Sequence, residues 1–369
     1  MNITKKEFKV LAENLKFPEG PIYMNDGSII LVEIARGTLS KVNKNGSVEV
    51  VADLGGGPNG AAIGPDGYCY VCNNGGFEWE VSFDKKYMRP VSQSKNYVGG
   101  SIQKVNLNTG QFSTLYTECN DISLKGPNDI VFDKNGDFWF TDLGKVRERN
   151  MDRGAIYWAK SDGSEIREVI QPFMTPNGIG LSLDEKTLYV AETEGGKLYS
   201  YKIIDEGKVE KLPFPVSING GRLLNNEGGI KRFDSLALEK NGNICVATLI
   251  NGGISVISPS GDLVEFVTDT EFKIIGRSSN VVKVAGYNVN LESIESKILK
   301  MEGINLCKVS SKYNSVLGNM LIAEIIALDG YSLIDIKRGM KTGLEKYEIP
   351  TKISFVKSIE LNENAKIKR

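Results

Sequence analysis

Short apolar strands separated by polar turns repeat along residues 17–253. Each copy starts at a turn such as P-E-G or P-N-G, continues as an apolar strand, and reaches a second strand through a polar turn such as D-G or N-G. The five copies cover residues 17–37, 57–76, 126–145, 175–196 and 232–253. A strand, an N-G or D-G turn and a second strand are the signature of a β-hairpin. The pattern therefore predicts one hairpin repeated five times.

A further pair of strands follows each hairpin, as over residues 38–54 and 253–269. Four strands in a unit of roughly 40–60 residues are typical of propeller blades. A stack of β-sandwich domains would not explain why one hairpin recurs through a single region. We therefore predict a mainly β fold, a β-propeller, over residues 1–269.

The second copy is followed by a polar and aromatic segment, residues 77–99, which interrupts the alternation. One interpretation is a surface insertion of the kind that loops tolerate. The other is a lid, because the segment leaves the strand that follows the P-N-G turn and carries Phe77 and Trp79. The sequence leaves both interpretations open.

After residue 269 the glycine-rich hairpins stop and helical patterns begin. Residues 291–301 place Ile294, Ile298 and Met301 on one helical face, with Asn290 as the N-cap. We expect a second helix over residues 336–347, ended by Pro350. Two apolar strands are expected over residues 319–328 and 352–359. This predicts a separate small α+β domain over residues 270–369.

Composition and charge limit the binding partners and the cellular location that the sequence indicates. The chain has 45 basic and 46 acidic residues, so its net charge of −1 indicates neither nucleic acid nor an anionic membrane as a partner. No apolar run approaches the roughly 20 residues that cross a bilayer, and the first residues show no signal peptide. The five cysteines are scattered, and Cys69 and Cys72 alternate along one apolar strand. We expect reduced, structural thiols in a cytoplasmic protein.

The chain contains no histidine. This excludes Ser-His and Cys-His nucleophile pairs, histidine-ligated zinc, and any imidazole acid or base. Any catalysis must therefore use carboxylates, amides, Lys, Tyr, Cys or a metal bound through oxygen.

An acid or an amide stands at the head of every hairpin copy. These five residues are Glu19, Asn59, Asn128, Asn177 and Asp234. The first strand of each propeller blade lines the central channel, so equivalent positions converge around the axis. A single P-N-G is ordinary turn chemistry, but recurrence in register with Glu19 and Asp234 replacing Asn favours a shared site. Oxygen-only ligands favour Ca²⁺, or Mg²⁺ and Mn²⁺.

The motifs FPEGP, GPNDIVFDKNGDFWFTD, TPNGIGLSLDEKTLYVAE and RFDSLALEKNGNICVA resemble the regucalcin/gluconolactonase family over residues 8–268. The resemblance implies a six-bladed propeller with a divalent metal held by Glu19, Asn128, Asn177 and Asp234. It also implies that Asn59 lies beside the metal or contacts the substrate. Calcium is the expected cofactor, with magnesium, manganese or zinc as alternatives.

The implied activity is hydrolysis of a sugar lactone or a related small-molecule ester. The metal would polarise the carbonyl, and Asp234 would act as general base or nucleophile, either directly or through a bound water. The sequence does not choose between these routes. Asp129 could assist, but we interpret it as a turn residue.

The tail shows a second resemblance. Residues 276–299 and 348–369 are similar to the small C-terminal domain of adenylate-forming enzymes such as acyl-CoA synthetases. The resemblance implies Lys366 as the adenylation lysine, although an exposed lysine in a frayed terminus is the alternative. The match departs from the family at Ser279 and Ala365, and no phosphate-cradling loop lies upstream. The tail would then need a ligase large domain as a partner.

The propeller lacks most of one blade. In the family the sixth blade combines C-terminal strands with an N-terminal strand, here residues 8–15, and the strands expected after residue 269 are missing. Either the propeller is incompletely closed, or a hairpin over residues 270–286 partly substitutes. An open edge would favour self-association. Two further functions therefore stay open: a non-catalytic calcium-binding scaffold, and a small domain that acts in trans for a ligase.

Overall fold

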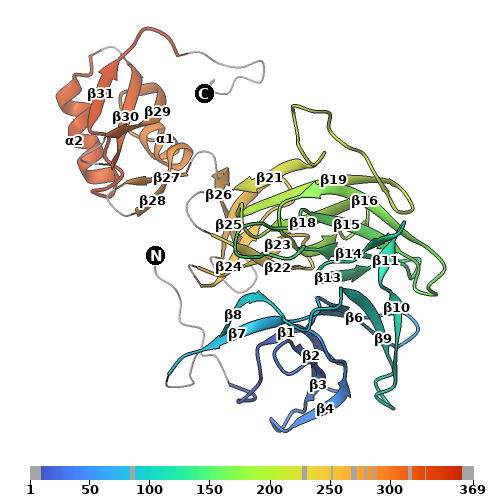
Figure 1. The fold of residues 1–369 in the computed structure, drawn as a ribbon. Helices are drawn as coiled ribbons and strands as arrows, with labels where there is room; N and C mark the ends of the chain where they lie inside the picture. The colour runs from blue at the N-terminus through green and yellow to red at the C-terminus, as the bar shows by residue number, and fades with distance from the viewer. Residues whose placement is uncertain are drawn as a thin grey trace. The chain divides into compact units, whose positions relative to one another are not determined.

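The structure is a computed structural model of the 369-residue chain. It describes residues 10–83, 88–226, 231–250, 252–266, 272–277, 281–284, 287–314, 318–328 and 330–359. The chain divides into two compact units (Figure 1), one made of Met1–Leu224 with Gly229–Ser255 and the other of Asn225–Gly228 with Val256–Arg369. Within the described ranges, no helix is long and apolar enough to cross a membrane.

The first unit is built from antiparallel sheets that follow one another along the chain (Figure 1), as the mainly β prediction requires. The first sheet contains β1 (Pro18–Tyr23), β2 (Ile29–Glu33), β3 (Thr38–Val42) and β4 (Val48–Asp53). The second contains β5 (Pro58–Ile63), β6 (Cys69–Asn73), β9 (Ser101–Val105) and β10 (Phe112–Tyr116). The third contains β13 (Pro127–Phe132), β14 (Phe138–Asp142), β15 (Gly154–Ala159) and β16 (Ile166–Phe173).

The later sheets extend the same plan. The fourth contains β17 (Pro176–Leu181), β18 (Thr187–Glu192), β19 (Lys197–Asp205), β20 (Lys208–Val209) and β21 (Arg222–Asn226). The fifth contains β22 (Phe233–Leu238), β23 (Ile244–Thr248), β24 (Ile254–Ile257), β25 (Asp262–Phe266) and β26 (Phe272–Arg277). Two short hairpins pair β7 (Phe77–Val81) with β8 (Met88–Gln93) and β11 (Glu118–Cys119) with β12 (Ile122–Ser123). The repeated hairpins predicted from the sequence are thus the first two strands of five successive sheets.

Each predicted D-G or N-G turn folds because one residue takes a left-handed backbone conformation. Gly27, Gly67, Gly136 and Gly242 have φ between 78° and 87° at this position. Glycine adopts such angles without steric cost. In the fourth sheet Glu185 fills the same position with φ 53°, which shows that the turn geometry persists without the glycine.

The first strands of successive sheets pack against one another in chain order, β1 on β5, β5 on β13, β13 on β17 and β17 on β22. Glycines at the strand heads allow this approach. A Cβ on Gly20 would lie 2.8 Å from the backbone N of Ala61, and a Cβ on Gly178 would lie 2.6 Å from the backbone O of Asp234. Larger side chains there would push the inner strands apart, so these glycines set the spacing of the channel wall.

The expected sixth blade has no sheet of its own in the described part of the chain. The predicted N-terminal strand over residues 8–15 is wrong, because residues 10–15 form no strand and residues 8 and 9 lie outside the described ranges. The hairpin proposed over residues 270–286 is also not formed as one unit. Instead, β26 pairs with β25, and β27 (Val281–Val284) pairs with β28 (Tyr287–Asn290).

Cys69 and Cys72 lie on β6 and are fully buried in two different core clusters, so they occupy opposite faces of the sheet. Burial raises the pKa of the Cys69 thiol to about 12. A thiol that stays protonated is a poor nucleophile and metal ligand. This agrees with their interpretation as structural residues, although they are more deeply buried than half-buried strand positions would be.

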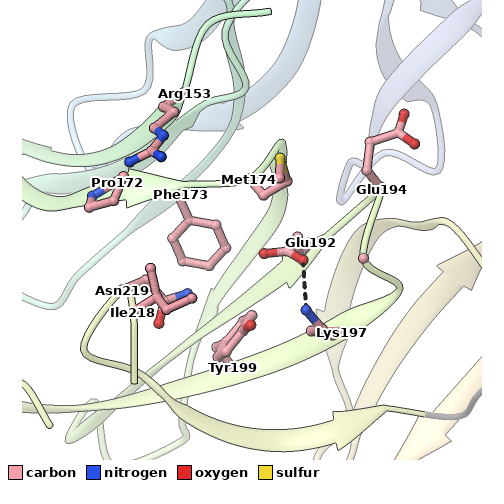
Figure 2. A pocket seen from close by; sticks show the side chains of 11 residues that line it. Arg153, Pro172, Phe173, Met174, Glu192, Glu194, Lys197, Tyr199, Ile218 and Asn219 are labelled. Atoms are coloured by element: carbon pink, nitrogen blue, oxygen red, sulfur yellow. Dashed lines mark ion pairs between the residues drawn. The ribbon is translucent and has the colours of Figure 1, made fainter. Parts of the chain in front are cut away.

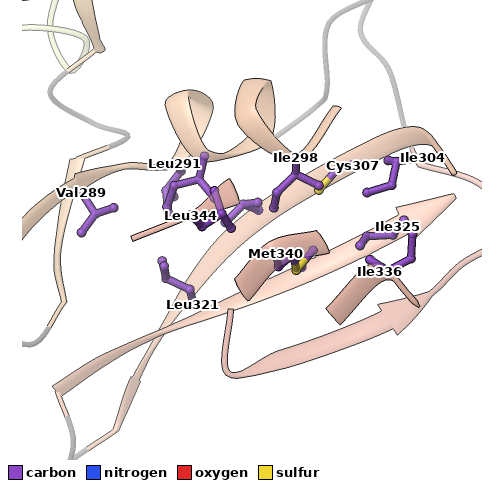
Figure 3. Packing of buried hydrophobic residues seen from close by; sticks show 13 residues of the cluster. Val289, Leu291, Ile298, Ile304, Cys307, Leu321, Ile325, Ile336, Met340 and Leu344 are labelled. Atoms are coloured by element: carbon purple, nitrogen blue, oxygen red, sulfur yellow. The ribbon is translucent and has the colours of Figure 1, made fainter. Parts of the chain in front are cut away.

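The second unit forms its own core. The hairpin of β27 and β28 is followed by α1 (Leu291–Leu299), β29 (Ile304–Asn314), β30 (Gly318–Ala327), α2 (Leu333–Gly343) and β31 (Lys352–Phe355). β29 and β30 are antiparallel, and β31 joins β30 in parallel. Figure 3 shows apolar side chains from both helices and from β29 and β30 in one cluster. The α+β architecture predicted for the tail is therefore present.

The helix predictions differ in accuracy. The first is confirmed at its start, since Asn290 caps α1 by accepting a hydrogen bond from the backbone N–H of Ser293 at 2.8 Å, and Ile294 and Ile298 are buried. The helix ends at Leu299, so Met301 lies beyond it, although its side chain packs against the same cluster. The second helix starts and ends earlier than predicted from the sequence. Ser332 forms a capping box with Asp335 and begins α2 at Leu333. The capping box of Ser332 and Asp335, three residues apart, places the start of the helix before the predicted residue 336.

We predict that Gly178→Ala lowers the free energy of unfolding by about 1–3 kcal/mol, the usual cost of overpacking. The added methyl group would meet the backbone oxygen of Asp234, which cannot rotate away as a side chain could. Urea denaturation measures the effect. The control is Ser113→Ala on the exposed edge strand β10, which should change stability by less than about 0.5 kcal/mol. Equal stability of the two variants would show that the inner strands are not closely packed at this point.

Candidate functional site

The five head residues occupy the same place in their sheets. Each is the second residue of an inner strand, namely β1, β5, β13, β17 or β22; they are Glu19, Asn59, Asn128, Asn177 and Asp234. In every sheet the register with the second strand shifts immediately at this head. Such irregularities bend a strand locally and redirect a side chain. The sequence predicted the recurrence of the heads but not the repeated bulge that orients them.

Asn177 and Asp234 are in direct contact. The Asn177 Nδ2 group donates to the Asp234 Oδ1 atom at 2.6 Å and to the Thr193 hydroxyl at 3.2 Å. Both amide hydrogens are therefore used on one side of the side chain. The Asn177 Oδ1 atom is buried and has no hydrogen-bond donor in the described residues. A buried acceptor without a donor costs free energy unless something else, such as a cation, satisfies it.

The pKa of Glu19 is affected by two other carboxylates. Its pKa is raised to about 7, first by loss of water around it and then by the negative charges of Asp234 and Asp129. The pKa of Asp234 is also raised by burial, although the hydrogen bond from Asn177 opposes the shift. Charges influence one another in this way only over short distances. Acids from three different sheets thus share one poorly solvated region.

Asn128 and Asn59 are placed on neighbouring inner strands. A Cβ on Gly60, the residue after Asn59, would lie 2.7 Å from the Cα atom of Asp129, the residue after Asn128. Asn128 is buried, whereas Asn59 is half-buried. Within the described residues, neither amide side chain makes a hydrogen bond. The structure brings their backbones together but does not connect their side chains to Asp234.

Asp129 was interpreted as a turn residue, and this is wrong. It lies on the inner strand β13, where loss of water around its carboxyl and the charge of Asp234 raise its pKa to about 7. Its side chain interacts with the backbone N–H of Ile179 and with Ser235 on the next two inner strands. Asp129 stands where Gly20, Gly60 and Gly178 stand in other copies. This departure from a repeated glycine is the sequence signal that was available.

The β7–β8 hairpin formed by residues 77–93 contacts the neighbouring sheets at both sides. The rings of Trp79 and Phe17 have centroids 4.9 Å apart, and Phe17 directly precedes the Pro18–Glu19 head. The Lys145 ammonium lies 4.5 Å from the Phe77 ring centroid and donates to the Gly76 carbonyl at 3.1 Å. Burial lowers the pKa of Lys145 to about 8. The hairpin is therefore anchored beside the Glu19 head, which favours the lid interpretation over a loose surface insertion.

The donor set fits a hard cation. No group of three or more Cys, Asp or Glu side chains suited to a metal is found among the residues that the structure describes. A cation at the heads would therefore need amide oxygens in addition to carboxylates. The unsatisfied Asn177 Oδ1 atom, adjacent to Asp234, is such an oxygen, and oxygen donors suit Ca²⁺ or Mg²⁺. Lys366, the candidate in the tail, lies outside the described residues.

Successive antiparallel sheets of four or five strands, whose inner strands carry acids and amides at one end, define a propeller-type protein with a polar channel. Comparison with known proteins identifies the family. Residues 17–271 match the SMP-30/Gluconolactonase/LRE-like region, so the chain belongs to this family.

Individual relatives agree with this assignment. The chain is 30% identical over 245 residues to lactonase drp35 of Staphylococcus saprophyticus, covering 66% of this chain and 67% of that protein. It therefore spans about two thirds of the length of the curated relatives it matches.

Solved structures share the fold. A gluconolactonase from Xanthomonas campestris has a TM-score of 0.53 and 20% identity, covering 69% of this chain and 76% of that one. Regucalcin from Agrobacterium tumefaciens, a calcium-binding protein, has a TM-score of 0.51 and 17% identity, covering 68% and 74%. At these identities the likeness establishes the propeller-type fold.

We predict that a divalent cation stabilises the protein more at pH 8 than at pH 5. The raised pKa values mean that Glu19 and Asp129 keep their protons up to about pH 7 when folded but lose them near pH 4 when unfolded. The metal-free protein binds more protons than the unfolded chain in this window, so its stability falls as pH rises through it. A cation must displace these protons, so it gains affinity as the pH rises.

Thermal unfolding with and without Ca²⁺ at the two pH values measures this difference. At about 100 times the Kd, the gain at pH 8 should be about 2.7 kcal/mol. Glu19→Gln should reduce the gain, whereas Glu118→Gln, an exposed residue on β11, should leave it unchanged. The same Ca²⁺ effect at pH 5 and pH 8 would contradict the proposed role of these carboxyls.

Proposed function

We propose that this protein hydrolyses a sugar lactone or a related small-molecule ester, using a divalent cation, Ca²⁺, at the inner-strand heads. Glu19, Asn128, Asn177 and Asp234 would hold the cation, and Asn59 would contact the substrate. Membership of a family whose relatives include proteins named lactonase and gluconolactonase supports the reaction class.

The observation that carries the proposal is the buried Asn177 Oδ1 atom beside Asp234. Its amide nitrogen is fully engaged with Asp234 and Thr193, so the oxygen is held in a fixed direction without a donor. A non-catalytic core asparagine would ordinarily satisfy both ends of its amide. The arrangement is what a cation ligand requires.

The bound cation would supply a Lewis acid that polarises the carbonyl group of the lactone. The residues of the chain do the remaining work. Asp234 is oriented by the hydrogen bond from Asn177 at 2.6 Å and by the backbone N–H of Ser235. It would take a proton from the attacking water, or itself attack the carbonyl carbon, as the ring C–O bond of the lactone breaks. Burial raises the pKa of Asp234, which favours proton uptake, whereas a cation held by the same carboxylate would lower that pKa. The chain has no histidine that could compete for this role.

The substrate would be covered by the β7–β8 hairpin. Trp79 on this hairpin packs against Phe17, next to the Glu19 head, and provides an apolar surface beside the site. Exclusion of water on that side would strengthen the interaction between the carboxylates and a developing charge. The residues of this hairpin are therefore expected to influence which lactone is accepted.

For residues 270–369 we propose a domain like the small C-terminal domain of adenylate-forming enzymes. The order of two hairpins, two helices and a final parallel strand in the described residues supports this.

The decisive experiment is lactone hydrolysis by Asp234→Asn. The substitution keeps the shape of the side chain but removes the proton acceptor, so we expect a loss in kcat of at least about 100-fold. A pH-stat assay with a panel of lactones and esters measures it, and EDTA should also abolish turnover. The control is Asp162→Asn in an exposed turn, which should retain the wild-type rate.

Two results would contradict the proposal. One is unchanged turnover in folded Asp234→Asn. The other is cation binding without hydrolysis of any lactone or ester by the wild-type protein, which would instead favour a calcium-binding scaffold.

A further inference from the structure

A cavity of about 350 Å³ opens on the fourth sheet (Figure 2), and none of the five head residues is among those that line it. Its wall comes from the end of β16, the end of β18, the start of β19 and the loop after β20. The charged and polar lining residues are Arg153, Glu192, Glu194, Lys197, Tyr199 and Asn219. Phe173, Met174 and Ile218 supply an apolar side. A volume near the lower end of the usual range for ligand pockets suits a small molecule.

Comparison among the sheets shows that Glu192 is unusual. The last residue of the second strand is a buried acid or amide in the first four sheets: Glu33, Asn73, Asp142 and Glu192. The first three bind the backbone before their own inner strand, accepting from the N–H groups of Lys16, Gly57 and Gly126 respectively, at 2.6, 2.8 and 2.7 Å. These side chains hold the strand head in place.

In the fourth sheet another residue takes over this task. The Thr175 hydroxyl accepts from the backbone N–H of Glu194 at 3.0 Å. The bond from the Thr193 N–H to the Thr175 carbonyl, at 3.1 Å, has a backbone counterpart in each of the first three sheets, so the hydroxyl contact is what distinguishes the fourth sheet. Glu192 makes no hydrogen bond to a backbone N–H in the described residues. Glu192 as a whole residue is 3% exposed, and its carboxylate instead lies 3.6 Å from the Lys197 ammonium, in the cavity wall. Glu192 therefore does not hold the strand head as its counterparts do, and its carboxylate lies in the wall of the cavity.

Gly195 leaves the space that the Glu192 carboxylate and the Lys197 ammonium occupy. A Cβ at this position would overlap the Glu192 carboxylate and lie 3.3 Å from the Lys197 ammonium. Its φ is not in the left-handed region, so the absence of a side chain, rather than backbone freedom, is what the position requires. The cavity is therefore shaped around the ion pair.

The charged side chains that line the cavity favour a ligand of one charge sign. Glu192 and Lys197 offset each other, and Glu194 forms an ion pair with Arg232. Arg153 is exposed at the cavity and has no ion pair within the described parts of the chain. One positive charge remains without a partner, which favours an anion. Glu192 can in addition accept a hydrogen bond from a hydroxyl group.

We propose that this cavity binds a small aliphatic hydroxycarboxylate, with the carboxylate on Arg153, a hydroxyl on the Glu192–Lys197 pair, and the carbon chain against Phe173 and Ile218. A hydroxycarboxylate is what lactone hydrolysis releases, so its identification as the product rests on the proposed function. The cavity also adjoins the candidate site, because Thr193, between Glu192 and Glu194, accepts the hydrogen bond from Asn177. The cavity is therefore a product subsite.

Isothermal titration calorimetry of the full chain with 4-hydroxyhexanoate tests the proposal, with hexanoate and γ-hexalactone as comparison ligands. The hydroxy acid should bind more tightly than either. Arg153→Ala should weaken its binding by roughly 10–100-fold, the usual effect of losing a charged hydrogen bond. Arg149→Ala, an exposed arginine in the same loop, should leave binding unchanged. Glu192→Gln should remove the preference for the hydroxy acid over hexanoate.

Asp234→Asn separates this site from the candidate cation site, where a hydroxycarboxylate could also chelate the metal. Binding that persists in Asp234→Asn and is lost in Arg153→Ala supports the subsite. Binding that is lost in Asp234→Asn and persists in Arg153→Ala overturns it, as does no binding by the wild-type protein. If the hydroxy acid binds as proposed but no lactone is hydrolysed, the proposed function fails while the binding site stands.

Discussion

The close approach of inner-strand backbones is the constraint on which the rest of the first unit depends. Gly20, Gly60 and Gly178 leave no room for a side chain, because the next inner strand passes within van der Waals contact of each one. This spacing brings acids from separate sheets into one region with little water. A propeller assembled with wider gaps would solvate these groups and separate them. The chemistry of the heads is thus a consequence of how tightly the strands pack.

Poor solvation has a direct electrostatic effect in a chain without histidine. Glu19 and Asp129 both have a pKa of about 7, so they hold protons that a cation could displace near neutral pH. The hydrogen bond from Asn177 opposes the same shift in Asp234. Carboxyls in such surroundings can exchange protons in the range where other proteins use imidazole. The fourth sheet adds a different use of a buried acid, since Thr175 replaces Glu192 in holding the strand head.

Local rules predicted much of the fold. Turns at Gly27 and Gly136 and the cap of Asn290 on α1 depend on neighbouring residues in the chain, and these features were correctly identified. The strand expected over residues 8–15 and the hairpin over 270–286 were inferred from the closure of a sixth blade, which depends on long-range pairing. β26 instead extends the fifth sheet, so the pairing of this segment could not be derived from its own residues.

The sequence alone determined the mainly β architecture, the recurrence of the five heads and the absence of any histidine ligand, because periodicity and residue type are properties of the chain itself. The contact between Asn177 and Asp234, the half-buried position of Asp129 on an inner strand and the cavity at Glu192 were decided only by tertiary structure. Each depends on groups that are distant along the chain and on how much water the packing excludes. The sequence of a turn motif such as P-N-D is the same whether or not water surrounds its aspartate. The packing of distant strands decides how much water reaches that side chain.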